Sequence, residues 1–447
     1  MTNYISITDA MKKGSGKVAV RGWIYRERGS NKMKFLVLRD SSDIIQCVLS
    51  RDKFAPDQVG LKEGVPSKEG KNQWADIDKL KIESSVELEG VIKKDERAPT
   101  GFEINVDKIN IINIAEDYPI NKDLNEELLG DRRHLWLRSR KMTAIMKIRS
   151  RYIQAREEFF IKEGFYRFDT PVLQPTQSEG GSTVFEVKYY NHKSYLAQTW
   201  QLYGEASIFA LEKTYNMGPT FRAEKSNTSR HLSEFWMAET EVAWWKLPEI
   251  TEFAKKEIKY CISAVAKDCI KELKILDIDS KKILDIAKKT WPTVKYREAL
   301  KILKEKDKMN IKFGKDLRTI EEQKLMQHFD TPVVVTHYPR EAMAFYKPAD
   351  PEFPDEALCF DMLAPECGLE IVGGSQRSLD IEDMSERLKA DGEDPKNYQF
   401  YFDLRKYGSV PHSGYGVGVE RVLAWILNLD SIKDAIGFPR TMNRFTP

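Results

Sequence analysis

Short stretches in which apolar and polar residues alternate fill the first 115 residues, and turn residues separate them. This alternation, rich in β-branched and aromatic residues, is typical of strands with one buried face. It predicts five strands, at residues 17–28, 32–40, 43–50, 84–96 and 102–114. A charged, glycine-rich stretch at 60–74 interrupts them. Five short strands with one interruption are expected either for a Greek-key barrel of the oligonucleotide-binding (OB) type or for another small β-barrel.

After residue 140 the apolar positions recur at helical spacing. Residues 143–165 are predicted to form a helix that Gly164 ends, and residues 166–173 a strand that carries Pro171. Two amphipathic helices and a buried strand are expected further on, at 249–274, 297–327 and 331–339.

This change of pattern predicts an α+β protein with two domains. Residues 116–139 show little strand character and are interpreted as a linker or hinge. The predicted division is an N-terminal barrel at 1–115, the linker at 116–139, and a larger domain at 140–447. Within the larger domain, about 249–327 is expected to be a helical insertion.

Composition excludes several classes of protein. The 447 residues are 41% hydrophobic and 11% aromatic, which is too apolar for a disordered chain, yet no apolar run approaches the roughly 20 residues that cross a bilayer. The start lacks the apolar stretch of a secretory signal, and five cysteines form no CxxC pair. We therefore expect a protein of the reducing cytoplasm. The net charge of +2 neither indicates nor excludes a nucleic-acid partner.

A basic hairpin at residues 217–244 is the first candidate for chemistry. Two strand-like runs flank a polar loop, and five side chains there offer contacts to an anionic nucleotide: Arg222, Glu224, Arg230, His231 and Phe235. A planar guanidinium binds two phosphate oxygens at once, and an aromatic ring stacks on a base. The alternative is a surface hairpin with solvated charges.

Two further segments complete the candidate set. Gly414, Gly416 and Gly418 alternate with larger residues before a helix that begins with Glu420 and Arg421, a pattern that is neither a Walker loop nor a Rossmann fingerprint. Residues 359–377 place two carboxylates, Asp361 and Glu370, on neighbouring predicted strands ahead of Arg377. Carboxylates beside a triphosphate are typical ligands of Mg²⁺, whereas an Arg/Glu pair can also simply stabilise a sheet.

Three segments in this order resemble the signature motifs of the class II aminoacyl-tRNA synthetases. FFIKEGFYRFDTPVLQP (159–175) is similar to the first motif, FRAE…RHLSEF (221–235) to the second, and GVGVERVLAWIL (416–427) to the third. With the N-terminal barrel, the chain resembles the aspartate/asparagine/lysine subgroup from residue 17 to 447. The resemblance implies an OB anticodon-binding domain, a catalytic domain on a six-stranded antiparallel sheet, a homodimer, ATP, Mg²⁺ and a tRNA substrate.

Within the subgroup, single residues favour the asparaginyl members. The segment LAQTWQLYGEA (196–206) resembles the stretch in which aspartyl members carry a lysine. Gly204 stands at the position of that lysine, and Glu205 follows it. The resemblance implies that Glu205 accepts from the substrate amide and repels a carboxylate. Glu239 is a second asparaginyl marker, and Arg377 is expected to donate to the side-chain carbonyl. The implied activity is formation of asparaginyl-adenylate and its transfer to tRNA(Asn).

The resemblance also implies roles position by position. The amino-acid site would comprise Glu179, Gln201, Glu205, Glu239 and Arg377, with Glu179 and Gln201 on the α-ammonium group. Arg222 and Arg421 would be catalytic, on the α- and γ-phosphates, and the whole ATP site would comprise Arg222, Glu224, Arg230, His231, Phe235, Glu370, Gly416, Gly418 and Arg421. Glu370 and Asp361 would hold the metal, and Phe35 and Gln46 would contact an anticodon base.

Departures from the family pattern leave three alternatives open. Trp200, Lys225 and Gly373 replace the residues usual at their positions, so the pocket wall and metal ligands can differ from those of relatives. The alternatives are an aspartyl-tRNA synthetase, an asparagine synthetase derived from this fold, and a non-catalytic RNA-binding paralogue. Gly204, Glu205 and Glu239 argue against the first. The barrel argues against the second, and the complete set of motif residues against the third.

Overall fold

The computed structural model describes residues 2–55, 73–120, 125–178, 184–226, 228–365 and 369–447. The chain divides into two compact units, Met1–Asn125 and Glu126–Pro447, within the segment interpreted as a linker. Helices α4 (Glu126–Asp131) and α5 (Arg133–Trp136) belong to the second unit. Every helix in the described ranges is too short or too polar to cross a lipid bilayer.

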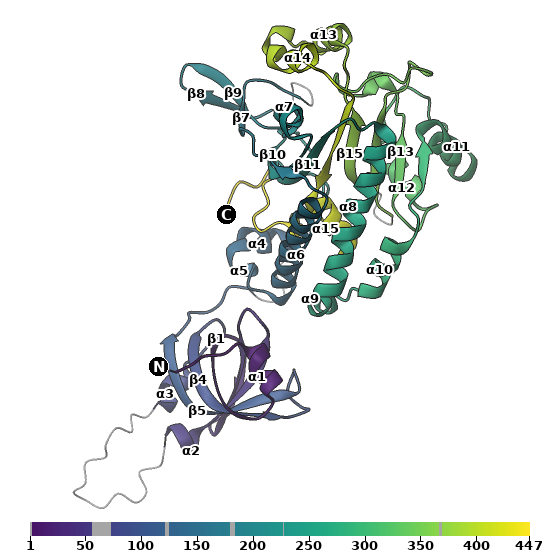
Figure 1. Cartoon of the computed structure of the whole chain (residues 1–447). Coiled ribbons are helices and arrows are strands. Elements are labelled where there is room, and N and C mark those ends of the chain that lie inside the picture. The colour runs from purple at the N-terminus through teal and green to yellow at the C-terminus, as the bar shows by residue number, and fades with distance from the viewer. Residues whose placement is uncertain (1, 56–72, 121–124, 179–183, 227, 366–368) are drawn as a thin grey trace, which may run out of the picture. The chain divides into compact units, whose positions relative to one another are not determined.

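The first unit contains a closed five-stranded barrel with strand order β1-β2-β3-β5-β4 (Figure 1). Each strand lies within two residues of its predicted bounds, because β-branched and aromatic runs, partly alternating and bounded by turn residues, mark strands clearly. The strands are β1 (Gly16–Gly29), β2 (Met33–Arg39), β3 (Ile44–Ser50), β4 (Ser85–Lys94) and β5 (Phe102–Asn113). Only β3 and β5 pair in parallel. The OB prediction is confirmed.

Three short helices among the described residues of the first unit contribute apolar side chains to the barrel core, and the sequence pattern did not predict them. Helix α1 (Ile7–Lys13) contributes Ile7 and Ala10 to the core, and Ser6 caps its first turn. Helices α2 (Arg51–Phe54) and α3 (Trp74–Asp78) add further apolar side chains. Helices of four to seven residues span too few turns to show a clear helical period.

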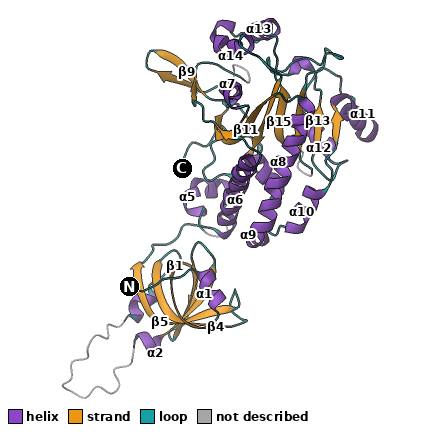
Figure 2. Ribbon diagram, viewed as in Figure 1, coloured by secondary structure: helices purple, strands orange, loops and turns teal. Residues whose placement is uncertain are grey.

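The second unit is organised on an eight-stranded sheet with the order β12-β13-β14-β15-β16-β11-β10-β6 (Figure 2). The six strands from β13 to β10 are antiparallel, as expected, while β12 and β6 extend the two edges in parallel. The strands are β6 (Tyr166–Arg167), β10 (Lys213–Phe221), β11 (Glu234–Ala243), β12 (Thr293–Lys295), β13 (Val333–Thr336), β14 (Cys359–Leu363), β15 (Glu370–Gln376) and β16 (His412–Gly418).

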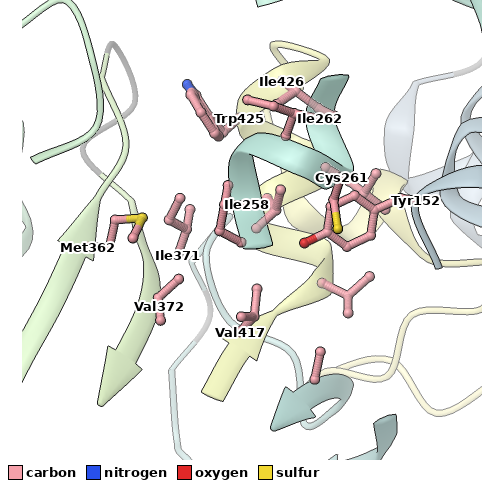
Figure 3. Packing of buried hydrophobic residues seen from close by; sticks show 14 of the residues in the cluster. Tyr152, Ile258, Cys261, Ile262, Met362, Ile371, Val372, Val417, Trp425 and Ile426 are labelled. Atoms are coloured by element: carbon pink, nitrogen blue, oxygen red, sulfur yellow. The ribbon is translucent and has the colours of Figure 1, made fainter. Parts of the chain in front are cut away.

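Helices α6 (Arg140–Lys162), α8 (Leu247–Asp268) and α15 (Val419–Ile426) pack against the sheet and form the main core with it. Figure 3 shows Tyr152 of α6 and Cys261 of α8 beside Val417 of β16. The other helices are α7 (Gln201–Leu211), α9 (Ile270–Ile275), α10 (Ser280–Lys288), α11 (Tyr296–Asp307), α12 (Thr319–Met326), α13 (Ile381–Ala390) and α14 (Gln399–Lys406). Strands β7 (Leu173–Gln174), β8 (Glu186–Tyr189) and β9 (His192–Leu196) form a small separate sheet.

The predicted strand at 166–173 is wrong as a continuous element. Only Tyr166–Arg167 and Leu173–Gln174 are strands, and they belong to different sheets. Pro171 lies in the gap, where it has no N–H to donate to a ladder. The helices expected at 249–274 and 297–327 are each interrupted, giving α8 with α9 and α11 with α12.

A buried ion pair joins the core helices to the sheet. Arg156 of α6 donates to Glu257 of α8 at 2.7 Å, and both side chains are fully buried. The remaining guanidinium nitrogens donate to the carbonyls of Asn216 and Glu239, at 2.9 and 3.2 Å. Tyr415 of β16 donates to the Glu257 carboxylate. A buried charge is tolerated only when it is fully paired, so this network holds β10, β11 and β16 at fixed positions.

Candidate active site

The two faces of the sheet have different roles because side chains alternate along each strand. On β14, Phe360 and Met362 enter the main core, while Asp361 between them lines a cavity on the opposite face. On β11, Ala238 faces the core and Glu239 the cavity. The period of two therefore presents alternate polar residues of the motif strands to one site.

The cavity has a volume of about 290 Å³ and is lined by residues of the second and third motif segments and of the carboxylate segment at 359–377. Thirteen of the site residues expected from the sequence line it: Gln201, Arg222, Glu224, Arg230, His231, Phe235, Glu239, Asp361, Glu370, Arg377, Gly416, Gly418 and Arg421. Glu205 is not among the lining residues, and Glu179 lies outside the described part of the chain. Separate segments thus converge as the motifs predict.

The alternating glycines of β16 make room for side chains of the neighbouring strand. Glu241 lies opposite Gly414 in the β11–β16 ladder, and a Cβ atom on Gly414 would approach its carboxylate to 2.1 Å. At Gly416 a Cβ atom would lie 2.5 Å from the terminal methyl carbon of Met237. Gly414 is therefore required by the packing of Glu241, not by close approach of a ligand.

Three charged residues meet at one end of the cavity. Arg421 Nη1 donates to the backbone oxygen of Glu370 at 2.9 Å and to its Oε2 at 3.0 Å. Burial opposes ionisation of Glu370, but the positive charges of Arg421 and Arg222 lower its pKa below the ordinary value. The Arg222 guanidinium also lies 5.6 Å from the ring centroid of Phe235. This end can bind phosphate groups beside an aromatic surface.

The loop between β10 and β11 places His231 against Glu224, with Nε2 and Oε2 3.3 Å apart. Its Nδ1 lies 2.6 Å from the hydroxyl of Thr228. Burial and the nearby positive charges lower the pKa of His231, so the neutral ring predominates at pH 7. Arg230 lies 3.6 Å from Glu322 of α12. The hairpin loop thus contacts the helical segment at the edge of the cavity.

Asp361 and Glu370 form a pair of carboxylates at the same end. A Cβ atom on Gly373 would lie 2.8 Å from Glu370 Oε1 and 3.5 Å from Asp361 Oδ1, so the glycine leaves the space between them open. Burial and the negative charge of Glu370 raise the pKa of Asp361 well above its ordinary value. Two hard oxygen ligands that repel one another, in a space kept clear by glycine, fit a Mg²⁺ ion that also contacts phosphate oxygens.

The opposite end is more deeply buried and holds the expected amino-acid residues. Glu239 accepts from the backbone N–H of Trp200 at 2.8 Å and from the hydroxyl of Thr199. Arg377 forms a two-point contact with Glu241 and donates from Nη1 to Ser375 at 2.7 Å. These contacts fix a carboxylate and a guanidinium on the cavity wall.

The structure corrects the expected role of Glu205. Its Oε1 accepts from Gln201 and Tyr401, its Oε2 accepts from Arg405, and His412 Nε2 lies 3.0 Å from the same Oε2. Four polar side chains thus surround the carboxylate, and the side chain is fully buried. Glu205 therefore lies beneath the cavity wall and does not itself offer an acceptor to a substrate amide.

Other residues of the site were not found from the sequence. Glu241 does not line the cavity but contacts Arg377, and it could have been recognised because it lies two residues after Glu239, on the same face of β11. Among the lining residues, Asp316, Tyr346 and Lys347 come from loops without regular spacing, so no periodic signal marks them.

The barrel brings its two expected residues onto a common face. Phe35 of β2 lies opposite Arg28 of β1, whose guanidinium is 5.2 Å from the ring centroid. Gln46 of β3 accepts from Arg28 at 3.4 Å and donates to Glu103 of β5 at 2.9 Å. The face therefore combines an aromatic surface with an oriented amide, a pattern typical of base recognition. Arg28 and Glu103 were not identified from the sequence.

Comparison with known proteins agrees with both units. Residues 125–442 match the family of class II tRNA synthetases (D, K and N), and residues 18–112 match the OB-fold nucleic acid binding domain. The chain is 42% identical to the asparagine--tRNA ligase of Thermoplasma acidophilum, over 99% of this chain and all of that protein. It is 43% identical to that of Thermococcus kodakarensis over the full length of both.

A solved structure shows the same architecture. The asparaginyl-tRNA synthetase of Pyrococcus horikoshii, complexed with asparaginyl-adenylate, superposes with a TM-score of 0.92 at 39% identity and full coverage of both chains. The motifs, the barrel and these full-length similarities indicate the same family. The chain therefore belongs to the class II tRNA synthetases, and within them to the asparagine--tRNA ligase family.

Proposed function

We propose that this chain catalyses two successive steps in its cavity. In the first, a carboxylate oxygen of asparagine attacks the α-phosphorus of ATP, and the bond to the β-phosphate breaks to release pyrophosphate. In the second, a hydroxyl of the terminal tRNA ribose attacks the carbonyl carbon of asparaginyl-adenylate, and AMP leaves. Neither step needs a covalent enzyme intermediate, so positioning and charge stabilisation carry the catalysis.

The proposed roles of the residues at the phosphate end are those that the resemblance to the family implies. Arg222 stabilises the charge that develops on the α-phosphate, and Arg421 binds the γ-phosphate. The adenine ring stacks between Phe235 and Arg421, with Gly416 and Gly418 behind it. His231 contacts the outer phosphates, and Glu224 and Arg230 of the same hairpin belong to the ATP site. The support is the convergence of all these side chains on one cavity.

Asp361 and Glu370 are proposed to hold Mg²⁺ together with the ATP phosphates. The ion would supply positive charge to the triphosphate and to the leaving pyrophosphate. The open space at Gly373 and the raised pKa of Asp361 support this assignment.

The observation that carries the preference for asparagine is the packing around Gly204. A Cβ atom there would lie 2.2 Å from the indole ring of Trp200, so a lysine side chain at this position has no space. The positive charge of Arg377 is compensated by Glu241 and by Glu205, whose Oε1 is 3.7 Å away. Because the charge of Arg377 is compensated in this way, a neutral amide is favoured over a carboxylate.

This preference is tested by asparagine-dependent and aspartate-dependent pyrophosphate exchange, measured side by side with the same enzyme. We expect asparagine to support exchange at least about tenfold better, because an added carboxylate lacks a compensating charge. Equal activity with aspartate would contradict the proposed selectivity and support an aspartyl or non-discriminating enzyme.

The barrel is proposed to bind the anticodon of tRNA(Asn) through Phe35 and Gln46. Phe35→Ala should weaken tRNA binding by roughly 1–3 kcal/mol, the typical stacking contribution of one base, and leave pyrophosphate exchange unchanged. The measurement is the Kd for tRNA, with Ile112→Ala on the exposed side of β5 as the control. Unchanged tRNA affinity in the Phe35 variant would exclude this face as the anticodon site.

We further propose a homodimer in the cytoplasm. Exposed apolar side chains gather around β6 and β7 in the segment that resembles the first motif: Tyr166, Phe168, Val172 and Leu173. A second copy of the chain would bury these exposed apolar side chains.

A further inference from the structure

Beneath the amino-acid end of the cavity, helix α14 and the start of strand β16 contribute to one buried polar cluster. Helix α14 provides Tyr401 and Arg405, and His412 begins β16. All three side chains point at Glu205 of α7, and none of the four lines the cavity. The cluster is therefore separate from the side chains assigned to substrate contact.

The contacts within the cluster are short and complete. Tyr401 donates to Glu205 Oε1 at 2.8 Å, and Arg405 donates to Oε2 at 2.6 Å. His412 Nε2 lies 3.0 Å from the same Oε2. Burial opposes the charged form, but Arg405 and His412 outweigh it and lower the pKa of Glu205 below its ordinary value. Glu205 is therefore an ionised group with a fixed orientation.

Two side chains of the cavity wall contact Glu205 directly. Gln201 lines the cavity, and its Nε2 donates to Glu205 Oε1 at 3.0 Å. Arg377 also lines it, and its Nε is 3.7 Å from the same oxygen. A change in the position of Glu205 therefore moves both a neutral donor and a cation at the substrate end.

The same residues also hold the backbone on both sides of the Arg377 side chain. Arg405 Nε donates to the carbonyl of Ser378 at 3.0 Å. The backbone N–H of Arg377 donates to the carbonyl of His412 at 2.9 Å. Side chain and backbone of Arg377 are thus fixed by one cluster.

We propose that Tyr401, Arg405 and His412 are positioning residues for asparagine: they fix Glu205, and through it they set Gln201 and Arg377 at the spacing that binds the substrate side chain. This inference rests on the proposed function. It gives Glu205 an indirect role, since three donors and His412 surround its carboxylate and the side chain does not line the cavity. The affinity for asparagine then depends on residues that never touch it.

The test uses the full-length enzyme and two conservative variants. Tyr401→Phe removes one donor to Glu205 without changing charge or shape, and Arg405→Lys keeps the charge but loses the fork that reaches both Glu205 and Ser378. We expect the KM for asparagine to rise about fivefold to tenfold in each, while the KM for ATP stays within about twofold. Tyr296→Phe is the matched control, because this buried tyrosine donates to Lys315 in a different core cluster.

Variant folding is checked by thermal melting and near-UV circular dichroism. An unchanged KM for asparagine in both folded variants would overturn the inference, and so would an equal rise in the KM for ATP, which indicates general loosening. If the wild-type enzyme exchanges pyrophosphate with asparagine and both variants have the same KM values as the wild type, only the positioning role is rejected. Wild-type enzyme inactive with asparagine would reject the proposed function instead.

Discussion

Replacing Arg222 by alanine is expected to slow asparagine-dependent pyrophosphate exchange by more than about 100-fold. The side chain lies in the cavity with Glu370 and Phe235, where the phosphates are proposed to bind. A preorganised charged donor that stabilises developing charge contributes about 3 kcal/mol or more, and 1.36 kcal/mol corresponds to a tenfold change in rate. The loss should appear mainly in kcat, because the interaction strengthens in the transition state.

Two further variants make this expectation specific. Lys225→Ala, three residues further along the same loop, removes a positive charge that does not line the cavity and should leave exchange near normal. Arg222→Lys keeps the charge but cannot bind two oxygens at once, so it should restore only part of the activity. Near-normal exchange by a folded Arg222→Ala enzyme would remove this residue from the mechanism.

Glu370→Ala is expected to raise the Mg²⁺ concentration that half-saturates exchange by at least about tenfold, and to lower exchange by about 100-fold at limiting Mg²⁺. The variant loses one of two carboxylates proposed as ligands and also the partner of Arg421. Glu322→Gln, at the edge of the same cavity, is the control, since that side chain contacts Arg230 and not Gly373. An unchanged Mg²⁺ titration in Glu370→Ala would assign the metal to other ligands.

The same pair predicts the direction of a pH effect in the wild-type enzyme. The pKa of Asp361 is raised well above its ordinary value by burial and by Glu370, so its neutral form is favoured without a cation. Binding of Mg²⁺ must then displace a proton, and the half-saturating Mg²⁺ concentration should fall as the pH rises through the titration of Asp361. Asp361→Asn, which cannot ionise, should lose this dependence.

Much of the architecture was predictable because local patterns encode it. In the barrel, alternation of period two marks each strand, and the structure confirms all five within two residues. The second hairpin arm, β11, and the strand-to-helix junction at Gly418 are also confirmed, whereas β10 ends at Phe221, so Arg222 and Glu224 lie in the loop beyond the first arm. The continuous strand at 166–173 failed because a proline-containing turn carries the chain from one sheet to another.

The sequence could also indicate which polar residues meet, because the motif strands alternate and their order determines which faces they share. Arg222 of the second motif and Arg421 of the third lie at one end of the cavity together with Glu370 of β15, as the sequence predicts. The charged residues from loops, such as Lys347 and Asp316, carry no periodic signal and needed the folded chain to place them.

The sequence by itself therefore determined the barrel, the motif strands and the set of residues that share one cavity. Only the tertiary structure decided what Glu205 does. Its partners Tyr401, Arg405 and His412 lie 196 to 207 residues away along the chain, and together with Gln201 they surround its carboxylate. The polar groups packed around a carboxylate decide whether it can contact the substrate or instead holds a neighbouring side chain in place. Those groups come together only when distant segments of the chain fold against one another.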